Sequence, residues 1–324
     1  MSMSDDGAGT DADFVDSADP ELDREGPDGL AYYRGEPLNG SVYTLDSEGG
    51  IGEIAAFRDG LRSTEVFYFL DGRRAEERTY VEGRPFDEWQ AWHPDGTLAR
   101  RELYSWQGRL RWRTRWSESG EVLEDTDVER AERGIDAEAV REDDARVSWL
   151  QDGSRWFLDD EPLTGQVIER AGPDPRAPIV AVQSHRDGYY AGPQRTWFAD
   201  GPRRTVGLVW RNRPAGLFLE WYATGALAEE KAFDAESELL ERRAWDASGA
   251  VTAEWRGGPR ESTVHRETWP DGAPKLLGVR GPAGRIGAWV SFAPGGQVVG
   301  EDYFSPEGEL VAGYRWDEAG NPRP

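Results

Sequence analysis

The chain has 324 residues, a length that allows two or three domains and a large core. Only 37% of its residues are hydrophobic, but 11% are aromatic and 15 are tryptophan, so large rings must supply much of the buried area. The formal net charge of −24 disfavours nucleic acids and anionic lipid as partners, and the absence of cysteine excludes disulfides and thiolate sites.

Residues 1–30 are predicted to be a disordered acidic N-terminal segment. They carry many carboxylates and few apolar side chains, among them Phe14, Val15 and Leu22, which is too little apolar surface to offset the entropy of ordering. An acidic tail that docks on a basic partner is the functional alternative.

Residues 31–124 form the first predicted β-repeat module. Glycines recur on a twelve-residue grid, which accommodates one short strand and one turn, and the segments between them are rich in aromatic and β-branched residues. Short strands at this regular spacing favour antiparallel hairpins over βαβ units. We therefore expect an all-β protein, an elongated array of about twenty short antiparallel strands in hairpin repeats.

Residues 125–152 interrupt this pattern with a charged stretch that suits short helices, and we interpret it as a partly helical linker. Residues 153–256 form a second module that duplicates the first, because Trp92, Gly96 and Trp116 recur 129 residues later as Trp221, Gly225 and Trp245. Residues 257–324 form a third, shorter β-repeat array.

The repeating unit is an aromatic residue four positions before a turn glycine. Glycine supplies the positive φ of a tight hairpin, and the aromatic ring anchors the hairpin by burial and cross-strand packing. The aromatic anchors are Tyr68, Trp92, Trp116, Trp197, Trp221, Trp245, Trp269, Phe292, Phe304 and Trp316. The turn glycines are Gly72, Gly96, Gly120, Gly201, Gly225, Gly249, Gly272, Gly296, Gly308 and Gly320.

A second aromatic row is predicted as the partner-binding surface. Trp89, Phe218 and Trp289 each precede an anchor by three residues, and an odd separation in a strand places two side chains on opposite faces. If the anchors face the core, this row faces outward. The alternative is that the sheet curls and buries both rows.

The repeats resemble the variant MORN repeats of bacteria, a family of antitoxin-like or immunity-like proteins. The family pattern is similar to Gly-x-Trp-x-x-Tyr-x-x-x-Gly-x-Leu-x-x-Glu, and residues 287–301 and 216–230 fit it. Residues 89–98 fit it too, with Asp87 in place of the leading glycine. The resemblance covers roughly residues 32–124 and 155–318 and implies an antiparallel hairpin array used for protein contacts, with toxin neutralisation as one role.

No catalytic, cofactor-binding or metal-binding residues are predicted. His93, His185 and His265 are scattered without metal-ligand spacing, and abundant carboxylates such as Asp143 and Asp144 single out no catalytic pair. The outline of a dinucleotide loop at residues 50–55 lacks the following helix. We therefore expect a protein that is not an enzyme.

The leading interpretation is a cytoplasmic scaffold that binds another protein, either a basic toxin neutralised by this acidic chain or a subunit of a complex. The cytoplasmic location rests on the lack of a secretory signal and of an apolar run of about 18 residues. A carbohydrate-binding or cell-wall-binding repeat protein is the first alternative, distinguishable by a polysaccharide pull-down. A membrane-associated scaffold is the second, distinguishable by liposome flotation.

Overall fold

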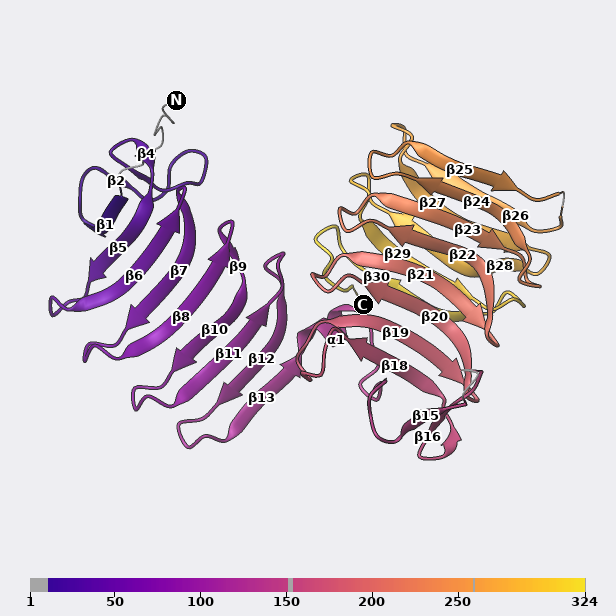
Figure 1. The fold of residues 1–324 in the computed structure, drawn as a ribbon, viewed down its shortest axis with the longest axis horizontal. Helices are drawn as coiled ribbons and strands as arrows, with labels where there is room; N and C mark the ends of the chain where they lie inside the picture. The colour runs from indigo at the N-terminus through magenta and orange to yellow at the C-terminus, as the bar shows by residue number, and fades with distance from the viewer. Residues whose placement is uncertain (1–10, 151–153, 259, 324) are drawn as a thin grey trace, which may run out of the picture. The chain divides into compact units, whose positions relative to one another are not determined.

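The computed structural model describes residues 11–150, 154–258 and 260–323. Over these residues it contains thirty strands and one short helix, and most strand pairs are antiparallel hairpins, which confirms the predicted all-β hairpin array. The larger number of strands reflects several of only two or three residues. The chain divides into two compact units, Met1–Val128 (unit 1) and Glu129–Pro324 (unit 2) (Figure 1).

Unit 1 is built on one ten-stranded sheet. Its hairpins follow one another in chain order. Two pairings depart from it: β1 joins β5 in parallel, and β10 pairs with β8 past the two-residue β9. The strands of the sheet are β1 (Asp11–Asp16), β5 (Asn39–Leu45), β6 (Ile51–Arg58), β7 (Leu61–Tyr68), β8 (Arg74–Val81), β9 (Arg84–Pro85), β10 (Asp87–Trp92), β11 (Leu98–Tyr104), β12 (Leu110–Trp116) and β13 (Val122–Asp127). A small separate sheet contains β2 (Leu22–Asp23), β3 (Tyr32–Tyr33) and β4 (Glu36–Pro37).

The aromatic–glycine motif forms a three-residue hairpin loop with a bulge. Between β10 and β11, the Gly96 amide donates to the His93 carbonyl at 2.8 Å, and the His93 amide donates to the Thr97 carbonyl at 2.8 Å. Gly96 has a φ of 90°, and all ten predicted turn glycines have positive φ. This is a type I turn closed by a left-handed residue, which glycine adopts at low cost. The anchor Trp92 ends the strand, where the ladder shifts register.

The N-terminal segment is ordered from residue 11, contrary to the predicted disorder over residues 1–30. β1 places Val15 opposite Val42, and Val15 is buried with Leu38, Ala55 and Phe57. Most acidic side chains of the segment remain partly or fully exposed, so their hydration is retained while a few apolar groups are buried. Average composition underestimates this kind of order. Residues 1–10 lie outside the described residues.

Unit 2 begins with α1 (Val128–Glu132), whose first residue lies at the unit boundary, and contains a fourteen-stranded sheet. Its first layer repeats the plan of unit 1, including a parallel entry strand, β14, that pairs with β18. The strands of this layer are β14 (Val140–Arg141), β18 (Gly165–Arg170), β19 (Ile179–Arg186), β20 (Tyr189–Trp197), β21 (Arg203–Trp210), β22 (Arg213–Trp221), β23 (Leu227–Phe233), β24 (Leu239–Trp245) and β25 (Val251–Arg256). A separate small sheet holds β15 (Val147–Trp149), β16 (Trp156–Leu158) and β17 (Glu161–Pro162).

The stretch predicted as a linker, residues 125–152, does not form one segment. Residues 125–127 complete β13 of unit 1, and α1 confirms the predicted short helix. Beyond it, Ile135 and Ala139 are buried against Ile168 and Trp197, so this part belongs to the core of unit 2. The hydrophobic contacts of these two residues outweigh the charged character that made the stretch resemble a linker.

The third array does not stand apart from the second module. Its strands β26 (Thr263–Thr268), β27 (Pro274–Gly281), β28 (Gly284–Phe292), β29 (Val298–Phe304) and β30 (Leu310–Arg315) form a second layer. In Figure 1 these strands, coloured orange to yellow, lie against the first layer of unit 2. β28 meets β22 in parallel at Gly216, and one continuous hydrophobic cluster contains residues of both layers.

The two layers cross at a pair of glycines. A Cβ atom on Gly216 would lie 2.4 Å from Gly287 Cα, a distance that real side chains do not tolerate. Both glycines have positive φ, 69° for Gly216 and 65° for Gly287. These are the leading glycines of the two best-fitting repeats, and their lack of a side chain lets the backbones touch.

Candidate functional site

The predicted outer row of aromatic residues occupies three different environments. Trp89 is half-buried in unit 1, where its indole donates to the Thr79 carbonyl at 2.8 Å. Its ring lies 5.2 Å from that of Tyr80 and 4.7 Å from that of Tyr104, and the Arg78 guanidinium is 5.2 Å from its centroid. Trp89 is therefore part of a packed, partly exposed surface network.

The rings of Phe218 and Trp289 each pack directly over a glycine of the neighbouring strand. A Cβ atom on Gly207 would meet the Phe218 ring at 2.2 Å, and one on Gly278 would meet the Trp289 ring at 2.3 Å. Phe218 remains partly exposed. Each ring thus fills the space that a side chain on the adjacent strand would take.

Trp289 is only 1% exposed, so its predicted role as a partner contact is wrong. Its indole donates to the Val279 carbonyl at 3.1 Å, and Arg285 and His265 cover the ring at centroid distances of 4.4 Å and 5.1 Å. The outer face is closed here by side chains of the same unit, and the Arg285 guanidinium stacks favourably on the indole face.

In unit 2 the anchors Trp221 and Phe292 face the core between the two layers, whereas the Phe304 ring lies 5.7 Å from the Arg285 guanidinium that also covers Trp289. Trp221 is 6% exposed and belongs to a buried cluster. Its neighbours in that cluster include Leu219, Leu217 and Val206, each at most 1% exposed. Phe218, at an odd spacing from Trp221, does not belong to this cluster, as expected for opposite faces. The third array buries this face.

In unit 1 the equivalent face carries polar residues. Subtracting 129 from Val206, Leu208, Leu217 and Leu219 of the buried face gives Glu77, Thr79, Glu88 and Gln90. Burial of four aliphatic side chains contributes roughly 1.5–3 kcal/mol each, whereas a carboxylate buried in the same place costs several kcal/mol. An apolar second layer like that of unit 2 therefore cannot cover this face.

Asp87 gives a second reason for the difference between the units. It stands where unit 2 has Gly216 and keeps the left-handed conformation, with a φ of 54°. Aspartate tolerates this conformation better than most residues. Its side chain, however, prevents the backbone contact that Gly216 and Gly287 make, so a strand cannot cross β10 in the same way.

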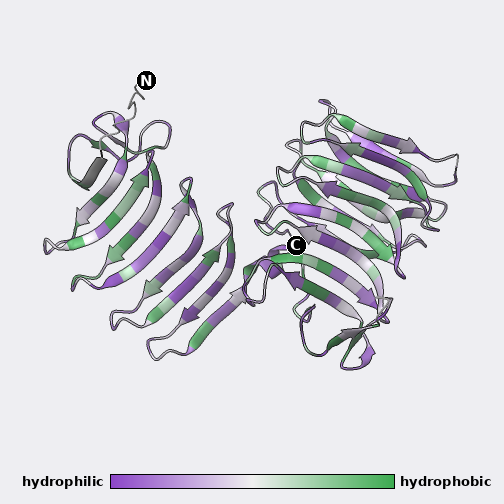
Figure 2. Cartoon of the chain, in the orientation of Figure 1, coloured by the Kyte–Doolittle hydropathy of each residue, from purple (hydrophilic) through white to green (hydrophobic). Residues whose placement is uncertain are grey.

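We define the anchor face of unit 1 as the set of residues that share the side of the anchors on β7 to β13. Cross-strand register places them together, with Gln90 opposite both Glu77 and Arg101 and Thr114 opposite Asp125. The face comprises Tyr68, Glu77, Glu88, Gln90, Trp92, Trp112, Trp116 and Asp125, all of which are half-buried or exposed. Within unit 1 the strands β8 to β13 contribute no residue to a buried hydrophobic cluster of the described chain, and Figure 2 shows many hydrophilic positions along them.

The opposite face of unit 1 is a ladder of arginines and carboxylates that neutralise one another. Arg78 contacts Glu65 at 3.2 Å and Glu76 at 2.9 Å, and Arg113 contacts Glu102 at 2.7 Å. Phenol groups join the ladder, since Tyr80 donates to Glu65 at 2.9 Å. The charges of this face are thus paired within the ladder, and it lacks the row of aromatic anchors.

The anchor face of unit 1 was not predicted as a candidate site from the sequence. The signal was present in the duplication itself, because four aliphatic positions of one copy are glutamate, glutamine or threonine in the other. The pattern can be interpreted as an uncovered face in unit 1 only once the structure shows which face is buried in unit 2.

The three histidines lie apart in the structure, and among the residues described no group of three or more histidine, aspartate or glutamate side chains is arranged to hold a metal ion. His185 is buried against Trp156 and Tyr190, and burial lowers its pKa to about 4. Hairpin register places Phe57 of unit 1 at the same position, two residues before the turn. His93 and His265 are partly exposed.

Across the described ranges, no helix has the length and apolar character needed to cross a bilayer. No family model matches the chain, and no curated protein matches it. Among solved structures it is similar to the crystal structure of TcdB2–TccC3 without the hypervariable C-terminal region, at 10% identity and a TM-score of 0.16. That match covers 92% of this chain but only 17% of the other protein.

Proposed function

We propose that the protein is a non-enzymatic binding scaffold, and that a basic protein docks on the anchor face of unit 1. The observation that carries this proposal is the contrast between the two copies of one module. In unit 2 the anchor face is covered by a second β-layer, whereas in unit 1 the same face keeps its aromatic anchors half-exposed beside carboxylates.

The chemistry of the anchor face favours a cationic partner. Tyr68, Trp92 and Trp116 recur on alternate strands next to the turns, and half-exposed aromatic rings are enriched among the residues that dominate binding energies. Glu77 and Glu88 lie among them and contact Arg74 at 2.7 Å and Arg101 at 2.6 Å, and Asp125 accepts from Thr114 at 2.8 Å. Arginine or lysine of the partner would compete for these carboxylates. The net charge of −24 would also speed the approach of a basic protein.

A toxin neutralised in the cytoplasm is the specific form of this function that the MORN-like repeat pattern suggests. An acidic scaffold that covers a basic surface can block access to an anionic substrate of that toxin. In this form the partner would be toxic when produced alone and harmless when produced with this chain.

Site-specific photo-crosslinking in the native host tests the face directly. A photoreactive amino acid at Gln90 projects from the anchor face, and one at the adjacent Ala91 projects from the opposite face of the same strand. We expect the Gln90 variant alone to trap a partner with a high isoelectric point. The purified partner should then bind about tenfold more weakly at 300 mM than at 50 mM salt.

Replacing Trp92 and Trp116 with serine should weaken this binding by at least about tenfold. Replacing Trp245, the duplicate of Trp116 in unit 2, is the matched control and should leave binding unchanged. Crosslinking from Ala91 alone, equal crosslinking from both positions, or no trapped protein at either position would each overturn the proposal.

A further inference from the structure

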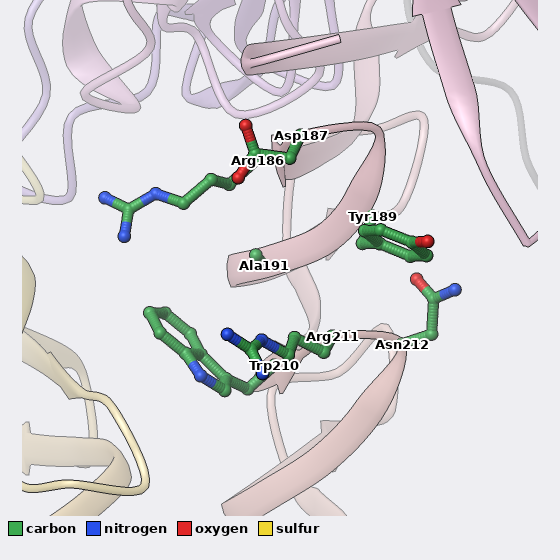
Figure 3. Close-up of a pocket in the computed structure, with 7 residues that line it drawn as sticks. All are labelled: Arg186, Asp187, Tyr189, Ala191, Trp210, Arg211 and Asn212. Carbon is green, nitrogen blue, oxygen red and sulfur yellow. The ribbon is translucent and has the colours of Figure 1, made fainter. Parts of the chain in front are cut away.

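Unit 2 contains a hollow between the β19–β20 and β21–β22 hairpins (Figure 3). Its volume is about 470 Å³, within the range of roughly 300–1,000 Å³ typical of small-molecule sites. Arg186, Asp187, Tyr189 and Ala191 line it from one hairpin, and Trp210 and Arg211 line it from the other. None of these residues belongs to the anchor face of unit 1.

Tight turns and one asparagine hold the walls in place. Arg211 and Asn212 both adopt positive φ, 50° and 62°, in the turn that joins β21 and β22. Asn212 accepts a hydrogen bond from the Tyr190 amide at 2.8 Å and donates one to the Ser154 carbonyl at 2.7 Å. The two hairpins are therefore tied to each other, which preorganises the hollow.

Two arginines of the hollow keep their charge available for a ligand. Among the described residues, neither the Arg186 guanidinium nor the Arg211 guanidinium makes a hydrogen bond or an ion pair. The Arg186 guanidinium lies 5.8 Å from the Trp210 ring centroid, and Figure 3 shows both guanidiniums on the Trp210 side of the hollow, with Tyr189 at the other side. An oxyanion placed over Trp210 would be within reach of both.

The corresponding place in unit 1 lacks these groups. Hairpin register matches Arg186 and Tyr189 with Arg58 and Leu61. In the same way Trp210 and Arg211 match Val81 and Glu82. The turns themselves persist, since Asp59 and Glu82 also have positive φ. Hairpin geometry alone therefore requires neither the aromatic rings nor the second cation.

We propose that this hollow binds a small organic monoanion with a planar aromatic body. Arg186 and Arg211 would hold its carboxylate through charge-assisted hydrogen bonds, and its ring would lie on Trp210 and Ala191. With Asp187 at the same rim, the charged groups of the hollow sum to +1, which suits a single carboxylate.

Isothermal titration of the full chain with 1-naphthoate tests this site. We expect one bound molecule per chain, with at least about tenfold weaker binding of 1-naphthalenemethanol, which keeps the ring but lacks the charge, and of acetate, which lacks the ring. Exchanging Trp210 and Arg211 together for valine and glutamate copies the residues of unit 1 and should weaken naphthoate binding by at least about thirtyfold.

Arg186→Gln should weaken binding about five- to tenfold, and its matched control, Arg58→Gln at the equivalent turn of unit 1, should leave binding unchanged. Because Arg186 is exposed, its replacement should not destabilise the fold, and this single variant tests the site even if the double variant is unstable. Absence of naphthoate binding, equal binding of the uncharged alcohol, or equal loss in Arg58→Gln and Arg186→Gln would each refute the proposed site.

Discussion

The crossing of Gly216 and Gly287 should be the most sensitive point of unit 2 to a single added methyl group. A Cβ atom on Gly216 would lie 2.4 Å from Gly287 Cα and 2.5 Å from the Ile286 carbonyl oxygen. These are backbone atoms, so no side-chain rotation can relieve the overlap. The substitution Gly216→Ala therefore has to separate the two layers or distort one of them.

The expected cost follows from two contributions. An alanine held at a φ of 69° costs about 1–2 kcal/mol, and an overpacked contact adds about 1–3 kcal/mol. Gly216→Ala should thus lower the free energy of unfolding of unit 2 by about 2–5 kcal/mol. Gly225 provides the matched control, because it has a φ of 86° but a Cβ atom added there would meet no described atom within 4 Å, so only the first contribution applies.

Urea unfolding monitored by circular dichroism measures both substitutions, with the transition of unit 2 fitted separately from that of unit 1. Hydrogen exchange should localise the loss of protection to the amides of β22 and β28, which the crossing shields from solvent. If Gly216→Ala costs no more than Gly225→Ala, the glycine contact does not hold the layers together and the reasoning fails.

Three further predictions concern buried groups of unit 2. Replacing Arg203 with methionine should destabilise unit 2 by about 3–5 kcal/mol, because Glu301, which is 0% exposed, would lose the cation that it pairs with. Replacing Glu301 with glutamine in the same chain should recover part of this loss, as measured by urea unfolding. His185 has its pKa lowered from 6.5 to about 4, so it takes up a proton more readily when unfolded, and stability present above pH 6.5 should fall by about 3 kcal/mol as the pH drops to 4. His185→Phe should remove that part of the acid sensitivity, and an unchanged difference between pH 7 and pH 4 would contradict it. Trp289→Ala should cost about 3–5 kcal/mol, and Trp89→Ala should cost clearly less because its ring is half-buried; equal losses in thermal melts would argue against the assigned burial.

The repeat pattern predicted local structure well because its signal is local. A turn glycine and the aromatic residue before it act within one hairpin, and the left-handed φ at Gly96 or Gly225 depends only on the loop that contains it. The same holds for Asp87, which keeps the conformation of the glycine it replaces. Order at residues 11–30 was missed because it depends on a parallel pairing with β5, a contact that segment composition does not encode.

The candidate sites were harder to predict because they depend on what covers each face. Trp89 and Trp289 occupy equivalent repeat positions, yet the second is closed off by Arg285 and His265, which come from two different strands. The hollow beside Trp210 likewise joins residues of two hairpins. No periodicity within a single repeat identifies either arrangement.

The amino-acid sequence by itself determined the strand period, the hairpin turns and the duplication, since each follows from backbone preferences within a few residues or from counting. Only the tertiary structure decided which face of each copy is buried. That choice depends on whether a second layer can approach, and it can approach where Gly216 meets Gly287 across an aliphatic surface. In unit 1, Asp87, Glu77 and Glu88 prevent such an approach, because a side chain blocks the crossing and buried carboxylates would lose their hydration.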